Sequence, residues 1–205
     1  MPDFLCKSCS NSFTVPEATI KKFHGWQPKE CFSCKKTKKS GASAREENLT
    51  TEQVLEKYTE GPTSGVFTDG SSEPNPGPGG WGAVYVIDNK IIAQNLGHDP
   101  ATTNNKMELT ALIAACKLVP EGTPTTLYTD SKLCVDTVNT WAKAWEARGW
   151  KKKQGPIKNL ELIQELYGVL RRRPELTVAW IAAHSGNRWN EYADALATAY
   201  RREEV

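Results

Sequence analysis

A glycine- and proline-rich stretch between two apolar runs limits the fold more than any other feature of this chain. Residues 66–86 read VFTDGSSEPNPGPGGWGAVYV, and the apolar runs Val66–Thr68 and Trp81–Val86 predict two strands joined by a shaped loop. Asp69 lies where the first strand is expected to end. An unpaired carboxylate at the end of a buried strand is unfavourable, so we expect a cation there, with a simple Asp-Gly hairpin turn as the alternative.

Two more acids lie in comparable settings downstream. The segment NNKME leads into LTALIAACKLV, which is apolar on nearly every face, and this predicts a buried helix that starts near Asn104. Glu108 lies in the first turns of this helix, where an acid is costly without a cation. A strand at Thr125–Thr129 ends in Asp130, which repeats the position of Asp69, with a plain helix N-cap as the alternative.

A further pair of acids follows the last predicted strand, Thr177–Ile181. Glu191 and Asp194 lie three residues apart, so they share one face of the predicted helix. An acidic first turn that complements the helix dipole is the alternative explanation.

The order of the predicted elements indicates the sheet topology. A third strand, Lys90–Gly97, follows a turn at Asp88-Asn89, so three antiparallel strands precede the first long helix. The later strands alternate with helices, which implies an α/β fold with a mixed sheet whose later strands run parallel to the first. Asp69 and Asp130 would then emerge at the same edge of the sheet, where ligands of such sheets bind.

Length, hydropathy and cysteine content limit the class of protein. The 205 residues can hold one ordinary domain and a small module. No apolar run approaches the roughly 18 residues of a membrane span, and the N-terminus lacks the features of a signal peptide. We therefore expect a cytoplasmic protein without membrane association and without a disulfide framework. Cys116 and Cys134 lie on apolar helical segments and are expected to be small core residues.

The other four cysteines form two C-x-x-C pairs, Cys6/Cys9 and Cys31/Cys34. Two such pairs supply the four thiolates of a structural Zn²⁺ site, which indicates a zinc ribbon over residues 1–41. Four buried free thiols, or a redox-active pair, are the alternatives. So short a module needs the metal to fold, with a small apolar cluster beside it that we assign to Phe4, Phe13, Val15, Phe23 and Trp26.

Charge is distributed unevenly along the chain. Residues 1–41 contain eight lysines and three acids, a net charge of +5. The run Lys35–Lys39 is either solvated surface or a contact for a phosphate backbone. Residues 42–64 are acidic and read as a linker with a short helix, which Thr50 and Gln53 cap and which ends at Tyr58, so we place the second domain at residues 65–205.

Residues 66–202 resemble the type 1 ribonucleases H. The resemblance rests on five segments in family order: TDGSSEPNPGPGGWG, TTNNKMELTA, YTDSK, WAKAWEARGWKKKQGPIKN and AHSGNRWNEYADALA. It implies the ribonuclease H fold, with five strands in the order 3-2-1-4-5 and helices on both faces. It also implies an endonuclease that hydrolyses the RNA strand of RNA/DNA hybrids and leaves 5′-phosphate and 3′-hydroxyl ends.

The resemblance implies catalytic roles for five residues. The family's metal-binding carboxylates fall on Asp69, Glu108, Asp130 and Asp194, which would hold two Mg²⁺ ions, with Mn²⁺ as the alternative metal. His184 matches a histidine that assists proton transfer or product release. Glu191 matches a further acid near the site.

The resemblance also implies how a hybrid is bound. Asn75 and Asn105 would face the RNA ribose, and Thr103 and Asn104 would form a pocket for a DNA phosphate. The segment 141–158 resembles the basic protrusion of the family, whose aromatic and basic side chains suit a hybrid minor groove; the residues are Trp141, Trp145, Trp150, Lys151 and Lys152. A solvated amphipathic helix is the alternative for this segment.

Two departures from the family pattern concern substrate preference. Lys132 stands where many relatives have Gln, and the loop 187–189 differs from the commoner sequence. Two other functions compete with the hybrid nuclease: a related nuclease of the junction resolvase or transposase type, and a noncatalytic hybrid-binding adaptor. We expect a monomer, and leave open whether the zinc ribbon binds nucleic acid or a protein partner.

Overall fold

The computed structural model describes residues 3–15, 17, 20, 28–31, 34 and 48–202. It divides into two compact units, Met1–Glu47 and Asn48–Val205, which are described separately. Several predictions lie outside the described residues: those for Phe23, Trp26, the basic run Lys35–Lys39 and the first part of the predicted linker, residues 42–47.

The first unit contains a short β-hairpin. β1 (Asp3–Leu5) pairs antiparallel with β2 (Ser12–Thr14), and the register sets Phe4 opposite Phe13. The ring centroids of these two residues lie 5.9 Å apart, as a small apolar cluster requires. Cys6 follows β1 directly and is buried.

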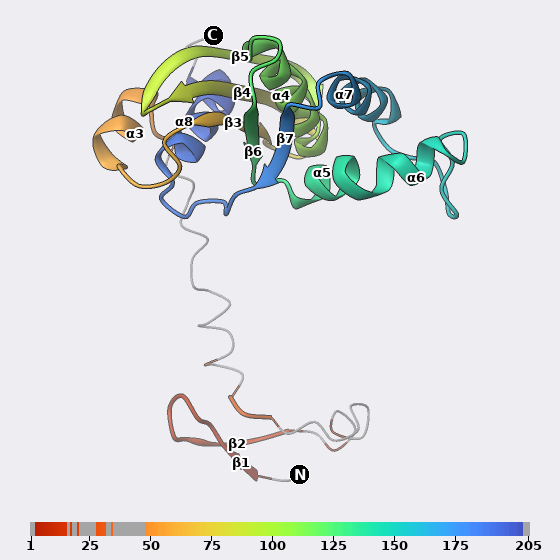
Figure 1. The fold of residues 1–205 in the computed structure, drawn as a ribbon. Helices are drawn as coiled ribbons and strands as arrows, with labels where there is room; N and C mark the ends of the chain where they lie inside the picture. Colours follow the sequence, from red (N-terminus) through yellow and green to blue (C-terminus); the bar gives the residue numbers. More distant parts are fainter. Residues whose placement is uncertain are drawn as a thin grey trace. The chain divides into compact units, whose positions relative to one another are not determined.

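The second unit is built on a five-stranded mixed sheet (Figure 1). Its strands lie in the order β5-β4-β3-β6-β7, which confirms the predicted order 3-2-1-4-5 and the α/β class. β4 pairs antiparallel with β3 and β5, whereas β6 runs parallel to β3 and β7. The strands are β3 (Gly65–Ser72), β4 (Gly77–Ile87), β5 (Lys90–Thr102), β6 (Thr125–Thr129) and β7 (Leu176–Trp180).

Helices α3, α4 and α8 lie in segments that the sequence predicted to be helical, whereas the sequence analysis gave no bounds for α7. The segment after Asp130 forms two α-helices divided by a π-helical segment, η1. No helix in the described part of the chain is long and apolar enough to span a membrane. The helices are α3 (Thr51–Lys57), α4 (Asn104–Leu118), α5 (Lys132–Asp136), η1 (Thr137–Trp141), α6 (Ala142–Glu146), α7 (Leu160–Arg172), α8 (Arg188–Ala197) and the 3₁₀ segment η2 (Ala199–Arg202).

Two apolar cores lie on opposite faces of the sheet. Successive side chains of a strand point to opposite faces, so the central strands supply both cores. One core joins Val66 and Tyr85 to α4 and α7, and the other joins Phe67 and Val84 to α3 and α8. Helices therefore cover both faces of the sheet, as predicted (Figure 1).

β3 continues past the point where the sequence predicted its end. Its parallel pairing with β6 stops at Thr68 opposite Thr129, but its antiparallel pairing with β4 continues to Ser72. Asp69 therefore lies inside β3, directly after the parallel pairing ends. Our prediction of a strand end at Asp69 was wrong because the glycine-rich start of β4, read as loop, pairs with β3.

Gly70 brings β3 close to α4. A Cβ atom at this position would lie 2.2 Å from the backbone nitrogen of Glu108, so a larger residue would push the helix away. The absence of a side chain at Gly70 therefore allows the first turns of α4 to lie against β3, immediately beside Asp69.

α3 belongs to the second unit. Thr50 and Gln53 form the predicted capping box, and the side chain of Val54 is 1% exposed within the core that also contains α8. The unit therefore begins at Asn48, whereas the sequence placed its start at residue 65. The glycine- and proline-rich segment after α3 reads as a boundary, but the contacts of α3 lie with residues much later in the chain.

Candidate active site

Three carboxylates from three elements converge beside the end of the β3/β6 parallel pairing. Asp69 comes from β3, Glu108 from α4 and Asp130 from the end of β6, and a ligand oxygen of each lies within 4.8 Å of the others. Asp194 on α8 interacts directly with the Asp69 side chain. The structure thus brings together all four acids that the sequence predicted.

Burial and the charges of neighbouring acids raise the pKa values of Asp69 and Glu108. The pKa of Asp69, which is 8% exposed, is raised well above its usual value by burial and then by Glu108, Asp130 and Asp194. Burial and the charge of Asp130 likewise raise the pKa of Glu108. A bound cation would reverse this cost, because positive charge favours the ionised carboxylates.

Some influences raise the pKa of Asp130 and others lower it. Burial raises its pKa, whereas His184 and a hydrogen bond from Asn190 act in the opposite direction. The indole N–H of Trp180 donates to the backbone carbonyl of Asp130 at 3.1 Å. Asn190 and Trp180 therefore help to fix the side chain and backbone of this acid, and the sequence analysis missed both.

Thr129 is a third supporting residue that the sequence analysis missed. Its hydroxyl donates to Oε2 of Glu108 at 3.2 Å and accepts the amide of Ser131 at 3.1 Å. The available signal was its place at the end of a predicted strand, next to Asp130. The partner on α4 could not be read from the sequence because it lies 21 residues away.

A second group of ligands lies beside the first. Atoms of His184, Glu191 and Asp194 fall within 4.8 Å of one another. Glu191 is 8% exposed and accepts the amide of Gly186 at 3.1 Å, so it also holds the loop that carries His184. His184 itself is exposed and has a backbone φ of 45°.

The carboxylate oxygens of this site suit hard divalent cations. Carboxylate oxygens are the preferred ligands of Mg²⁺, which keeps several waters and needs few protein groups. Acids with raised pKa values from β3, α4 and the end of β6 supply such oxygens, with Asp194 on α8 beside them. The site therefore fits the metal that the sequence predicted.

Hydrogen bonds link residues predicted for the RNA side to residues predicted for the DNA phosphate pocket. The amide of Ser72 donates to Oδ1 of Asn104 at 2.6 Å, and the amide of Asn104 donates to Oδ1 of Asn75 at 3.3 Å. Thr103 caps α4 by accepting the amide of Lys106. The β3–β4 loop and the start of α4 are thereby held together, next to the carboxylates.

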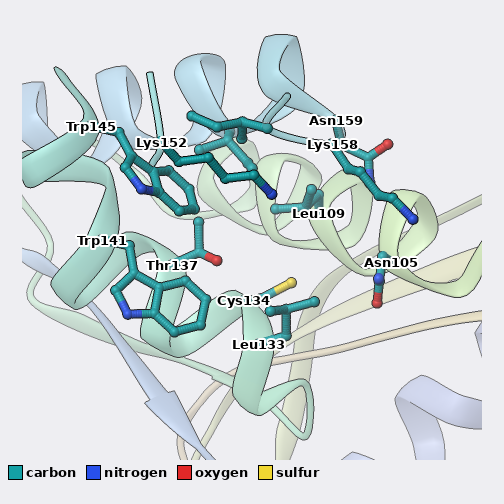
Figure 2. A pocket seen from close by; sticks show the side chains of 12 residues that line it. Asn105, Leu109, Leu133, Cys134, Thr137, Trp141, Trp145, Lys152, Lys158 and Asn159 are labelled. Carbon is teal, nitrogen blue, oxygen red and sulfur yellow. The ribbon is translucent and has the colours of Figure 1, made fainter. Parts of the chain in front are cut away.

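A cavity of about 230 Å³ lies beside this set. Asn105, Trp141, Trp145, Lys152 and Lys158 line it, together with apolar side chains (Figure 2). Figure 2 shows the two indoles on one side of the cavity, Asn105 and Lys158 on the other, and Lys152 between them. Aromatic and basic groups around an apolar floor form a surface that suits a nucleic acid strand.

Two of the predicted substrate-binding residues are placed differently from the rest. Trp150 packs edge to face on Tyr167, with ring centroids 6.1 Å apart, and is partly buried against the core. Lys151 is exposed but is not among the residues that line the cavity.

The four N-terminal cysteines cluster as predicted. Their sulfur atoms lie within 4.8 Å of one another, and those of Cys9 and Cys31 are 3.8 Å apart. Zn–S bonds of about 2.3 Å in a tetrahedron place sulfur atoms about 3.8 Å apart, so the cluster fits Zn²⁺. The amide of Cys31 donates to Cys6, and this hydrogen bond is the largest cause that lowers the pKa of the Cys6 thiol to about 6.

A five-stranded mixed sheet that gathers four acids at its centre defines the ribonuclease H-like class. The family model for RNase H matches residues 62–202, which is more than half of the chain. This chain belongs to the ribonuclease H family, and the resemblance to its type 1 members is confirmed.

Curated relatives agree with this assignment. The Ribonuclease H of Methylorubrum extorquens (strain PA1) is 44% identical over 138 residues, which cover 67% of this chain and 60% of that protein. The chain thus spans less than two thirds of that relative. The Ribonuclease H of Ehrlichia ruminantium (strain Gardel) is 46% identical over 133 residues, which cover 64% of this chain and 90% of that protein.

Solved structures also share the fold. LC9-RNase H1, described as a type 1 RNase H with the type 2 active-site motif, is 31% identical with a TM-score of 0.58, over 72% of this chain and 76% of that one. The RNase H domain of PFV is 23% identical with a TM-score of 0.57, over 67% of this chain and 93% of that domain. The second likeness concerns the fold alone.

Proposed function

We propose that this protein is an endonuclease that hydrolyses the RNA strand of RNA/DNA hybrids with two divalent metal ions. The convergence of Asp69, Glu108, Asp130 and Asp194 carries the proposal, together with membership of the ribonuclease H family. Four acids in one place suit a pair of cations that repel each other and must leave room for water and phosphate.

Each part of the site has a role in this proposal. Bound Mg²⁺ would activate the attacking water and stabilise the departing 3′ oxygen. Thr129 and Asn190 hold the acids in position through Glu108 and Asp130. His184, on the exposed side of the acids, would transfer protons or assist product release.

Strand discrimination would come from two neighbouring surfaces. Asn75 and Asn105 would contact the 2′-hydroxyls that distinguish RNA from DNA, and Thr103 and Asn104 would form a pocket for a DNA phosphate. The hydrogen bonds that join Ser72, Asn104 and Asn75 support the proposal because they fix the loop and the start of α4. The cavity lined by Trp141, Trp145 and Lys152 would bind the DNA strand through stacking and phosphate contacts (Figure 2).

We further propose that the first unit is a zinc ribbon whose metal is structural. Four thiolates complete the shell of Zn²⁺ and leave no position for a catalytic water. The net charge of +5 over residues 1–41 favours nucleic acid as its ligand.

The first prediction tests the reaction itself. With Mg²⁺, the protein should cut RNA at internal positions within an RNA/DNA duplex, leave 5′-phosphate ends, and cut neither double-stranded DNA nor single-stranded RNA, because each recognition surface needs a different strand. Gel analysis of end-labelled substrates measures this. Comparable rates on duplex DNA would favour a resolvase-type nuclease, and hybrid binding without cleavage would favour an adaptor.

A further inference from the structure

We infer that the segment Tyr58–Gly61 is a positioning element that clamps the loop carrying His184. The loop, residues 181–187, connects β7 to α8 and places His184 beside Glu191 and Asp194. The inference rests on the proposed function, in which His184 takes part in turnover.

The clamp consists of three adjoining contacts. Glu60 forms a parallel β-bridge with Asn187, and the amide of Arg188 donates to the Glu60 carbonyl at 2.8 Å. Gly61 has φ +118°, and a Cβ there would lie 3.3 Å from the Cα atom of Asn187 and 2.9 Å from its Oδ1, so the two segments pack tightly. The ring of Tyr58 would lie 3.8 Å from a Cβ at Gly186, so it covers this glycine.

The opposite side of the loop is held by α8 and by the loop itself. The amide of Gly186 donates to Glu191 at 3.1 Å, and the hydroxyl of Ser185 donates to the carbonyl of Ala182 at 2.8 Å. His184 and Gly186 have φ values of 45° and 79°, so the loop follows a path with two left-handed residues. The clamp and Glu191 together restrict the conformations that the loop can adopt.

The clamp is anchored in the core and belongs to an extension, residues 48–61, that precedes the region matched by the family model. Val54, on the helix directly before it, is 1% exposed and packs in the core that contains Trp189 and Tyr192. Residues 48–61 precede the part of the chain that the family model matches, residues 62–202. The extension therefore supplies a loop contact from outside the matched family region.

The chemical consequence follows from the place of His184 in the site. A loop held on both sides keeps the imidazole close to Glu191 and Asp194, whereas a loop held on one side would sample other positions more often. The hybrid-binding residues proposed above lie on the β3–β4 loop, α4 and the 141–158 segment, so releasing the clamp should lower kcat and leave KM nearly unchanged.

A double-mutant cycle tests this in the full-length protein. Tyr58→Ala should lower kcat for hybrid cleavage roughly three- to tenfold with KM within about twofold, and Tyr58→Phe, which keeps the ring, should restore it. Glu56→Ala, an exposed change on α3, is the matched control and should leave kcat unaltered. In a His184→Ala background, Tyr58→Ala should have no further effect on kcat.

Two outcomes of the cycle overturn the inference. One is a kcat for Tyr58→Ala equal to that of the unmodified protein. The other is an equal loss of kcat in both His184 backgrounds, which would indicate a general structural role. Assays are run well below the melting temperature of each variant, so that unfolding does not enter the comparison.

Amide hydrogen exchange provides a readout that does not depend on cleavage. Arg188 is the first residue of α8, where an amide has no partner within the helix, and its donation to Glu60 should protect it. Tyr58→Ala should speed exchange at Arg188, and Glu56→Ala should not. If the protein cleaves no hybrid, the proposed function fails while this result still decides the clamp; unchanged exchange in Tyr58→Ala overturns the clamp directly.

Discussion

Asp69 is costly to ionise in the folded protein, yet its ionised carboxylate is the form proposed to bind metal. It lies inside a central strand with 8% of its surface exposed, and three other acids surround it. Each unit by which the pKa of a buried acid is raised costs about 1.4 kcal/mol of stability when the group is ionised. The metal-free site is therefore a source of strain that cation binding should relieve.

Asp69→Asn should abolish hybrid cleavage and raise the melting temperature of the metal-free protein at pH 7. The sign follows from the raised pKa of Asp69: its folded form binds a proton more tightly than the unfolded chain, so stability is lost as pH rises above the usual value of 3.8 towards the folded pKa. The gain from Asn should therefore shrink as pH falls towards 4. Thermal melting with a chelator, across pH, measures it.

Asp88→Asn is the matched control for this experiment. It also removes one carboxylate, but Asp88 is exposed in the β4–β5 turn with φ 49°, a conformation that Asn adopts readily. It should keep full cleavage and should not raise the melting temperature of the metal-free protein. Retention of near-normal cleavage by Asp69→Asn would show that Asp69 is not a ligand of the catalytic metal.

The sequence predicted the acids at the residue scale but not the groups that orient them. An acid after an apolar strand is conspicuous because burial of its charge is costly. Thr129, Trp180 and Asn190 are ordinary residues for their elements, and their roles arise only from contacts with Glu108 and Asp130 across the fold.

At the scale of elements, α4 is the helix on which the site depends. Gly70 lets its first turn approach β3, and Arg173 satisfies its last turn. The guanidinium of Arg173 donates to the carbonyls of Cys116, Val119 and Pro120 at 2.6, 3.0 and 2.8 Å. These carbonyls lie at or beyond the helix end, where acceptors have no partner within the helix.

Arg173→Ala should lower the free energy of unfolding by about 2–4 kcal/mol, because it leaves several partly buried carbonyls without a donor. It also removes the ion pair with Glu175, formed at 2.9 Å with both side chains mostly buried. Urea or thermal unfolding measures the loss. Arg172→Ala, an exposed neighbour with the same charge, should cost under about 0.5 kcal/mol; equal losses in the two variants would contradict the capping role.

Element boundaries show where sequence patterns stop being informative. The turn at Asp88-Asn89 was predicted correctly because Asp and Asn tolerate positive φ better than most residues. The two φ values are 49° and 60°. The extension of β3 to Ser72 was missed because its partners are Gly79 and Gly80, which read as loop residues. Strand pairing decided their conformation over local preference.

At the scale of the whole molecule, the chain combines the region that the ribonuclease H family model matches with two segments that precede it, the cysteine-containing unit and α3. The sheet order, helical layers and four acids could be predicted from sequence because strands, turns and motifs lie in a recognisable order. The inclusion of α3 in the second unit could not, because it depends on contacts between Val54 and residues far along the chain, such as Trp189 and Tyr192. The cluster of four cysteines could be predicted because the spacing of two C-x-x-C pairs indicates it.

The ribbon and the acids are expected to act independently, since the four thiolates are a complete shell and the four carboxylates lie in a separate compact unit. A basic module joined to a nuclease raises the local concentration of the nuclease near nucleic acid without adding to its chemistry. The ribbon should therefore contribute to binding and not to turnover.

Deleting residues 1–41 tests this division. The truncated protein, which keeps α3 and its cap, should bind hybrid roughly tenfold more weakly with a shallower salt dependence, because fewer cations are released from the phosphates. Its kcat at saturating substrate should be unchanged, and metal analysis should find one Zn²⁺ per full-length chain and none after truncation. Unchanged affinity and salt slope would instead favour a protein partner for the ribbon. Loss of kcat in a truncated protein that melts normally would show that the ribbon contributes to the active site.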